Sequence, residues 1–189
     1  MSSLHRRRQS SIDFHSALTA AAGSDHATNL SPIVEKFPNA AISTPTRKIL
    51  LAYDGTEDAA YTLEYLKSKL LKDGDHLFIA HVLPMPVDNG QTHESNLIQL
   101  KEQRDRLLAH LRDISNNLLK SSLHITTTLV VLNHADANIA ICRIADHHDV
   151  HLVVVGRRRR DPKKPIPGAC STYILKQART PVMIVKPQF

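Results

Sequence analysis

A run of cationic residues between an apolar segment and a predicted helix is the part of this sequence best suited to bind a ligand. The apolar residues 152–155 are followed by Gly156, and Gly168 precedes Ser171, which we predict to cap the helix. Six cationic residues lie between the two glycines: Arg157, Arg158, Arg159, Arg160, Lys163 and Lys164. The unpaired N–H groups of a helix start attract anions, and glycine lets the backbone approach them closely. The chemistry predicted for this loop is phosphate binding.

A second loop with a charged side chain follows the apolar residues 48–53 and reads Asp54-Gly55-Thr56. Thr56 is predicted to cap a helix. In parallel sheets covered by helices, ligands bind beyond the carboxyl ends of the strands, at the point where the strand order reverses. We expect the Asp54 loop and the Gly156 loop to meet at that point.

Predicted strands and helices alternate along the chain. Apolar or β-branched runs predict five strands, at residues 48–53, 76–83, 125–132, 152–155 and 181–185. Helices are predicted after Thr56, over residues 93–121, after Asp136 and after Ser171. A right-handed crossover between parallel strands needs the length of a helix, so this alternation predicts an α/β fold. The fold would have a five-stranded parallel sheet with helices on both faces.

The first 45 residues differ in composition from the rest. They are rich in Ser, Ala, Thr and Asn and show no sustained apolar period. We therefore predict a disordered, basic and Ser-rich extension before one folded domain over residues 46–189. Residues 12–22 predict only a transient helix, because an isolated helix of that length is marginal in water. Three arginines directly before Ser10 resemble a basophilic kinase site, so Ser10 is a predicted phosphorylation site.

Composition argues against several classes of protein. No apolar window approaches 18 residues, and the N-terminal arginines precede no apolar segment, so neither a membrane span nor a secretory signal is predicted. Cys142 and Cys170 lack metal-ligand spacing, and we expect two reduced thiols in a cytoplasmic protein. We expect no metal site, and we interpret His147, His148 and His151 as solvated rings near a helix end.

The net charge of +6 is concentrated in the loop at residues 157–164, which contains no aromatic residue for base stacking. This pattern favours a small anion over nucleic acid. An alternative use of the same residues is a nuclear-import or nucleic-acid patch, which would place the protein in the nucleus.

Four motifs, in their order and spacing, resemble the universal stress protein family over about residues 46–187. They are KILLAYDGT at the first strand, HV at the end of the second, DVHLVVVG at the fourth and GACSTYILKQARTPVMIVKP at the end. The resemblance implies a Rossmann-like sheet with strand order 3-2-1-4-5, which places the reversal between the first and fourth strands. It also implies a homodimer joined through the last strand, residues 181–185, whose apolar edge would otherwise be a hazard in solution.

In nucleotide-binding members of this family the phosphate loop reads Gly, two residues, Gly, nine residues, Gly, then Ser or Thr. Here Gly156 and Gly168 match, but Arg159 replaces the second glycine, Ala169 occupies the Ser/Thr position, and the loop is one residue shorter. A left-handed backbone at Arg159 would cost about 1–2 kcal/mol. A charge-assisted bond from arginine to phosphate contributes about 1.5–3 kcal/mol, so the arginines are predicted to replace glycine amides as phosphate donors.

The resemblance also implies roles for Asp54, at the ribose or adenine side of a nucleotide, and for the backbone of Val82, against adenine. The ligand expected is ATP or AMP, with Mg²⁺ as an optional companion. The complete predicted nucleotide site is Asp54, Val82, Gly156, Arg157, Arg159, Gly168 and Ser171.

The predicted function is a dimeric regulatory module of the stress response that binds ATP or AMP. We do not predict an enzyme, because no motif places a histidine or lysine to activate Ser171, although slow ATP hydrolysis is compatible with the sequence. The alternative from another class is a dimeric interaction protein that binds no nucleotide and is regulated through its N-terminal tail.

Overall fold

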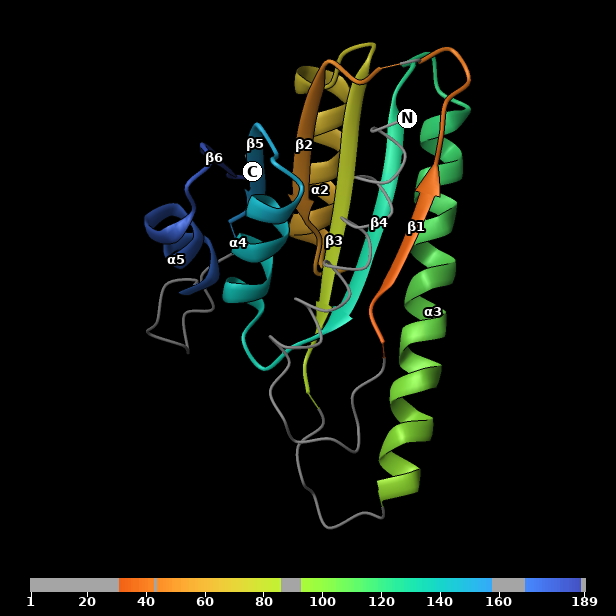
Figure 1. Cartoon of the computed structure of the whole chain (residues 1–189), viewed down its shortest axis with the longest axis vertical. Helices are drawn as coiled ribbons and strands as arrows, with labels where there is room; N and C mark the ends of the chain where they lie inside the picture. Colours follow the sequence, from red (N-terminus) through yellow and green to blue (C-terminus); the bar gives the residue numbers. More distant parts are fainter. Residues whose placement is uncertain (1–30, 43, 86–92, 158–168, 188–189) are drawn as a thin grey trace, which may run out of the picture.

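A six-stranded sheet in the order β1-β4-β3-β2-β5-β6 runs through the molecule (Figure 1). The structure is a computed structural model that describes residues 31–42, 44–85, 93–157 and 169–187. The strands are β1 (Ile33–Phe37), β2 (Arg47–Ala52), β3 (Asp75–Leu83), β4 (Thr126–Asn133), β5 (Leu152–Gly156) and β6 (Val182–Val185). Strands β2 to β6 are parallel and have the predicted order, whereas β1 is antiparallel to β4. The α/β class is confirmed, in a sheet with one strand more than predicted.

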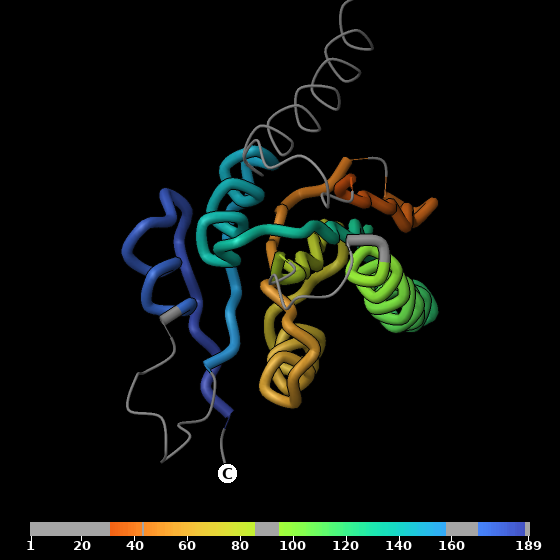
Figure 2. Tube along the Cα trace, turned by 90° about the horizontal axis from the view of Figure 1, so that it is seen from below, coloured from red at the N-terminus to blue at the C-terminus, as the bar shows by residue number. Residues whose placement is uncertain are grey.

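Helices cover both faces of the sheet, as predicted. On one face lie α2 (Glu57–Tyr65), its short π-helical continuation η1 (Leu66–Leu70) and α3 (His93–Leu119). On the other lie α4 (Ala137–His147) and α5 (Ala169–Gln177). Figure 2, seen from below, shows α4 and α5 on one side of the strands and α2 and α3 on the other.

The predicted helix caps are correct for two helices and wrong for one. Thr56 Oγ1 accepts a bond from the backbone N of Ala59 on α2 (3.3 Å), and Asp136 Oδ1 accepts one from the backbone N of Asn138 on α4 (2.8 Å). Ser171 does not cap α5, which begins two residues earlier at Ala169. Alanine is the strongest helix former, so the helix includes Ala169 and Ser171 lies in its first turn.

Strand β1 was not predicted, and the assignment of residues 33–37 to a disordered extension is wrong. The strand pairs with β4 from Ile33, opposite Val131, to Phe37. Arg112 on α3 bonds both carboxylate oxygens of Glu35 and holds the pKa of that carboxyl below its usual value. These partners are distant in the sequence, so the local pattern gave no signal. Residues 1–30, and with them Ser10, lie outside the described residues.

Two apolar clusters fill the space between the sheet and its helices. The cluster under α2 and α3 includes the fully buried Leu51, Ile79, Leu111 and Leu129. The cluster under α4 and α5 includes Leu50, Val130, Ile144 and Ile174. Side chains of successive strand residues therefore go to opposite clusters, as expected for strands covered on both faces.

Three aromatic rings stack at the amino-terminal end of the parallel strands. His76 lies 4.2 Å from Phe78 between ring centroids, and Phe78 lies 4.6 Å from His148. Burial lowers the pKa of both histidines to about 4, with added repulsion from Lys36 and Lys48. The interpretation of His148 as a solvated ring is wrong, because the fold brings Phe78 of β3 against the end of α4.

We expect this stack to make the fold sensitive to acid. Each imidazole has a pKa near 6.5 when unfolded and about 4 when folded, so the unfolded state binds more protons between these values. Stability is therefore fully present above pH 6.5 and decreases as the pH falls towards 4. After allowance for solvent screening we expect a loss of about 2 kcal/mol for the two rings.

Urea unfolding at a series of pH values measures this loss. His76→Gln keeps a hydrogen-bonding group opposite Thr128 Oγ1, which lies 2.8 Å from the His76 ring nitrogen, and should reduce the dependence between pH 6.5 and 4. If the free energy of unfolding of this variant depends on pH as strongly as that of the unmodified protein, His76 does not contribute to the acid sensitivity.

Candidate functional site

A pocket of about 390 Å³ opens at the carboxyl ends of the parallel strands, between β2 and β5. This is the position at which the strand order reverses, because β3 follows β2 on one side and β5 adjoins it on the other. The volume lies in the range of about 300–1,000 Å³ that is usual for small-molecule sites. The lining residues are Ala52, Tyr53, Asp54, Thr56, Asp58, Ala59, Ala80, Val82, Ala137, Asn138, Ile141, Val155, Gly156, Cys170 and Ser171.

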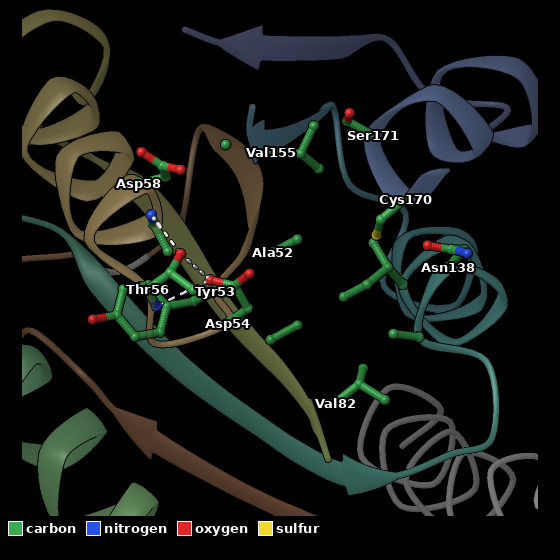
Figure 3. Close-up of a pocket in the computed structure, with 15 residues that line it drawn as sticks. Ala52, Tyr53, Asp54, Thr56, Asp58, Val82, Asn138, Val155, Cys170 and Ser171 are labelled. Carbon is green, nitrogen blue, oxygen red and sulfur yellow. Dashed lines mark hydrogen bonds between the residues drawn. The ribbon is translucent and has the colours of Figure 1, made fainter. Parts of the chain in front are cut away.

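The first wall of the pocket is the turn after β2. Asp54 Oδ1 accepts bonds from the Thr56 backbone N (3.1 Å) and from Thr56 Oγ1 (2.6 Å), which fixes the carboxylate at the pocket rim. Gly55 between them has φ of 79°, a left-handed conformation that glycine adopts without strain. Figure 3 shows Asp54 and Thr56 on one side of the pocket.

The opposite wall comes from the end of β5 and the start of α5. Val155 and Gly156 end the strand, and Cys170 and Ser171 belong to the first turn of α5 (Figure 3). A Cβ at Gly156 would lie 2.8 Å from Thr62 Oγ1 on α2, so glycine is needed for this close approach. The first turn of a helix faces a ligand with unpaired N–H groups, which suits an anion.

The first turn of α4 forms a third wall that sequence reasoning missed. Ala137, Asn138 and Ile141 line the pocket, and the side chain of Asn138 can both donate and accept hydrogen bonds. The signal was present, because the predicted cap Asp136 places the start of α4 at the same edge of the sheet. Asp58 on α2 was missed as well and is 9% exposed.

The floor of the pocket is apolar and formed by three neighbouring strands. Ala52 pairs in register with Ala80 of β3 and with Val155 of β5, and Val82 lies two residues beyond Ala80. Small and β-branched side chains leave a shallow apolar surface between the polar walls. Such a surface can take a flat aromatic ring, with polar groups bound at the rim.

Tyr53 lines the pocket, but its side chain belongs to the apolar cluster on the other face. Its hydroxyl lies 3.1 Å from Nε2 of His110 on α3. Burial, followed by the charge of Asp54, raises the pKa of this phenol. The hydroxyl is therefore neutral over the physiological range.

The structure brings together four of the seven predicted nucleotide-site residues. Asp54, Val82, Gly156 and Ser171 all line the pocket. Arg157 is exposed and is not among the lining residues; its backbone N donates to the Val185 carbonyl (2.8 Å). Arg159 and Gly168 lie outside the described residues.

The described part of the chain lacks both a membrane-spanning helix and a cluster of metal-ligating side chains. None of the described helices has the length and apolar content that a bilayer crossing requires. Among the described side chains, no three histidine, cysteine or acidic residues form a group that could hold a metal ion.

The sequence matches a known family over three quarters of its length. The model of the universal stress protein family matches residues 45–186. The chain belongs to the universal stress protein family.

Solved structures with the universal stress protein fold resemble this chain. The hypothetical protein MJ0577 has a TM-score of 0.59 and 22% identity, over 75% of this chain and 96% of its own. UspA from Lactobacillus plantarum has a TM-score of 0.58 and 14% identity, over 76% of this chain and 99% of its own. The Arabidopsis thaliana universal stress protein At3g01520, solved with AMP bound, has a TM-score of 0.51 and 17% identity, over 75% of this chain and 92% of its own. At these identities the likeness shows the fold, and no curated protein matches the sequence.

Proposed function

We propose that this universal stress protein is a regulatory module that binds ATP or AMP in the pocket between β2 and β5. The observation that carries the proposal is that Asp54, Val82, Gly156 and Ser171 line one cavity at the reversal of strand order. The apolar floor fits adenine, the Asp54 carboxylate can accept bonds from ribose hydroxyls, and the start of α5 faces the phosphates. The similar Arabidopsis protein with AMP bound supports this choice of ligand.

The pocket favours binding over catalysis. The described residues that line it include no histidine or lysine, so none of them offers an imidazole or amine base that could activate Ser171 or Cys170. Both cysteines are free thiols, which supports a place in the reducing cytoplasm.

We also propose a homodimer joined through β6. The strand is at the edge of the sheet, and Val182, Met183 and Ile184 are half-buried in the monomer. Beside it, α5 exposes Tyr173 (36%) and Leu175 (53%). An apolar edge strand next to exposed apolar side chains favours association with a second copy. Light scattering of the purified protein tests this, and a monomer at micromolar concentration would contradict it.

Thermal melting with added nucleotide tests the binding proposal. A ligand at a hundred times its Kd stabilises the folded state by about 2.7 kcal/mol, which is roughly 5–10 °C for a domain of this size. Asp54→Ala should weaken binding about 10-fold through loss of the ribose contacts, whereas Asp113→Ala, on the exposed surface of α3, should keep the full shift. Melting with ATP and with AMP, each with and without Mg²⁺, shows whether the protein binds the metal-bound triphosphate or the monophosphate. The absence of any shift in the unmodified protein would favour an interaction protein without nucleotide.

A further inference from the structure

Several polar side chains at the pocket already have a partner or a place in the proposed function. The Asp54 carboxylate accepts two bonds from Thr56 and lies on the ribose side. Tyr53 directs its hydroxyl to His110, on the other face of the sheet. Ser171 belongs to the first turn of α5, where the phosphates are proposed to bind. These four side chains leave the edge of the base without a polar contact.

Asn138 is the one amide side chain among the described residues that line the pocket. It is half-buried in the first turn of α4, and no hydrogen bond joins its amide group to another described residue. Figure 3 shows Asn138 on the α4 wall of the pocket. Its amide therefore has a donor and an acceptor available for a ligand.

The start of α4 holds this residue beside the pocket floor. Asp136 Oδ1 accepts bonds from the backbone N of Asn138 (2.8 Å) and of Ile139 (3.3 Å). The Asp136 backbone N donates to His134 Nδ1 (2.9 Å), and the His134 backbone N donates to the Leu83 carbonyl (3.0 Å). Leu83 ends β3, so this chain of bonds attaches the first turn of α4 to the carboxyl end of that strand.

An asparagine amide distinguishes adenine from guanine along one edge of the purine ring. Adenine presents a donor at N6 and an acceptor at N7, which match the oxygen and the nitrogen of the amide. Guanine presents two acceptors on the same edge, O6 and N7, so the amide oxygen has no donor to accept from. An amide that contacts this edge therefore favours adenine.

We propose that Asn138 selects adenine over guanine in this pocket, by donating to N7 and accepting from the N6 amino group. The inference rests on the proposed function and specifies how the base is recognised. Because β3 and β5 adjoin β2 on opposite sides, a base over Val82 and phosphates near Gly156 lie at opposite ends of the pocket. The attachment of α4 to the end of β3 places Asn138 on the side of the base.

Calorimetric titration of the full chain tests this selection. The unmodified protein should bind ATP and AMP about 10-fold more tightly than GTP and GMP, as expected when one base satisfies the amide and the other does not. Asn138→Ala removes both bonds and should lose this preference. Asn116→Ala, the same change at an exposed position of α3, should keep it. Without nucleotide, Asn138→Ala should melt within about 1 °C of the unmodified protein, because alanine is a strong helix former.

Replacement of N7 in the ligand gives a readout that a purely structural role of Asn138 would not change. 7-deaza-ATP, in which a C–H group replaces N7, should bind the unmodified protein about 10-fold more weakly than ATP. Asn138→Ala should bind the two ligands equally well, as expected when the contacting group is absent. Asn138→Asp keeps the shape of the side chain but places an acceptor opposite the N7 lone pair, so it should bind 7-deaza-ATP at least as tightly as ATP.

The possible results separate this inference from the proposed function. If adenine and guanine nucleotides bind equally well, or if Asn138→Ala keeps the preference for adenine, the inference is wrong and the nucleotide site stands. If 7-deaza-ATP is weaker than ATP by the same factor in the unmodified protein and in both Asn138 variants, another group contacts N7 and the inference is wrong. If no adenine nucleotide binds the unmodified protein, the proposed function and this inference are both wrong.

Discussion

Ala52→Leu is expected to abolish the nucleotide-dependent rise in melting temperature. Ala52 lies at the centre of the pocket floor in Figure 3, between Ala80 and Val155 in register. A leucine there extends three additional carbons into the space between the polar walls, where the proposed adenine ring would lie. We expect binding to weaken by at least 100-fold, because the backbone of a strand covered on both faces has little freedom to move aside.

The same substitution should leave the unliganded protein folded. The leucine enters an existing pocket and lies on its apolar floor, so it gains burial without displacing a packed neighbour. Ala60→Leu is the matched control. Ala60 is exposed on α2, so the leucine adds the same three carbons in solvent. Calorimetric titration with ATP and AMP measures both variants. Unchanged affinity in Ala52→Leu would place the ligand somewhere else.

Sequence reasoning predicted the elements that have their own local pattern. Five strands and their order followed from apolar runs and from the family resemblance, and the caps Thr56 and Asp136 followed from residue type alone. The turn at Asp54 and the glycine at Gly156 were predicted to meet, and both line the pocket. These features depend on short-range chemistry or on a repeated topology.

The features that were missed depend on contacts between distant parts of the chain. Strand β1 has a partner 98 residues away at its first pair, Ile33 with Val131. The burial of His148 at the end of α4 depends on Phe78 of β3. No residue near these positions in sequence reports such neighbours, so local periodicity carries no information about them.

Asp75→Ala is expected to cause the largest loss of stability among the charged residues considered. The Asp75 carboxylate is 2% exposed and accepts bonds from Arg47 Nε (3.0 Å), Arg47 Nη2 (2.6 Å) and the Lys72 backbone N (2.9 Å). Arg47 Nη2 also donates to the Leu70 carbonyl, so one guanidinium joins β2, β3 and the end of η1. Removal of the carboxylate leaves a half-buried cation and a backbone N–H without their acceptor.

We expect Asp75→Ala to cost about 3 kcal/mol, since breaking a buried ion pair costs about 3–5 kcal/mol and Arg47 retains some contact with water. Asp73→Ala is the control two residues away, because its carboxylate is 67% exposed and should matter by less than about 1 kcal/mol. Both are measured by urea unfolding.

The pair Arg47→Met with Asp75→Leu should recover much of the loss, because the main cost of the single change is the cation left without a partner. If the double variant is as unstable as the single one, shape at this site matters more than charge. Nucleotide affinity should not change in any of these variants, because Asp75 begins β3 at the end of the sheet opposite the pocket.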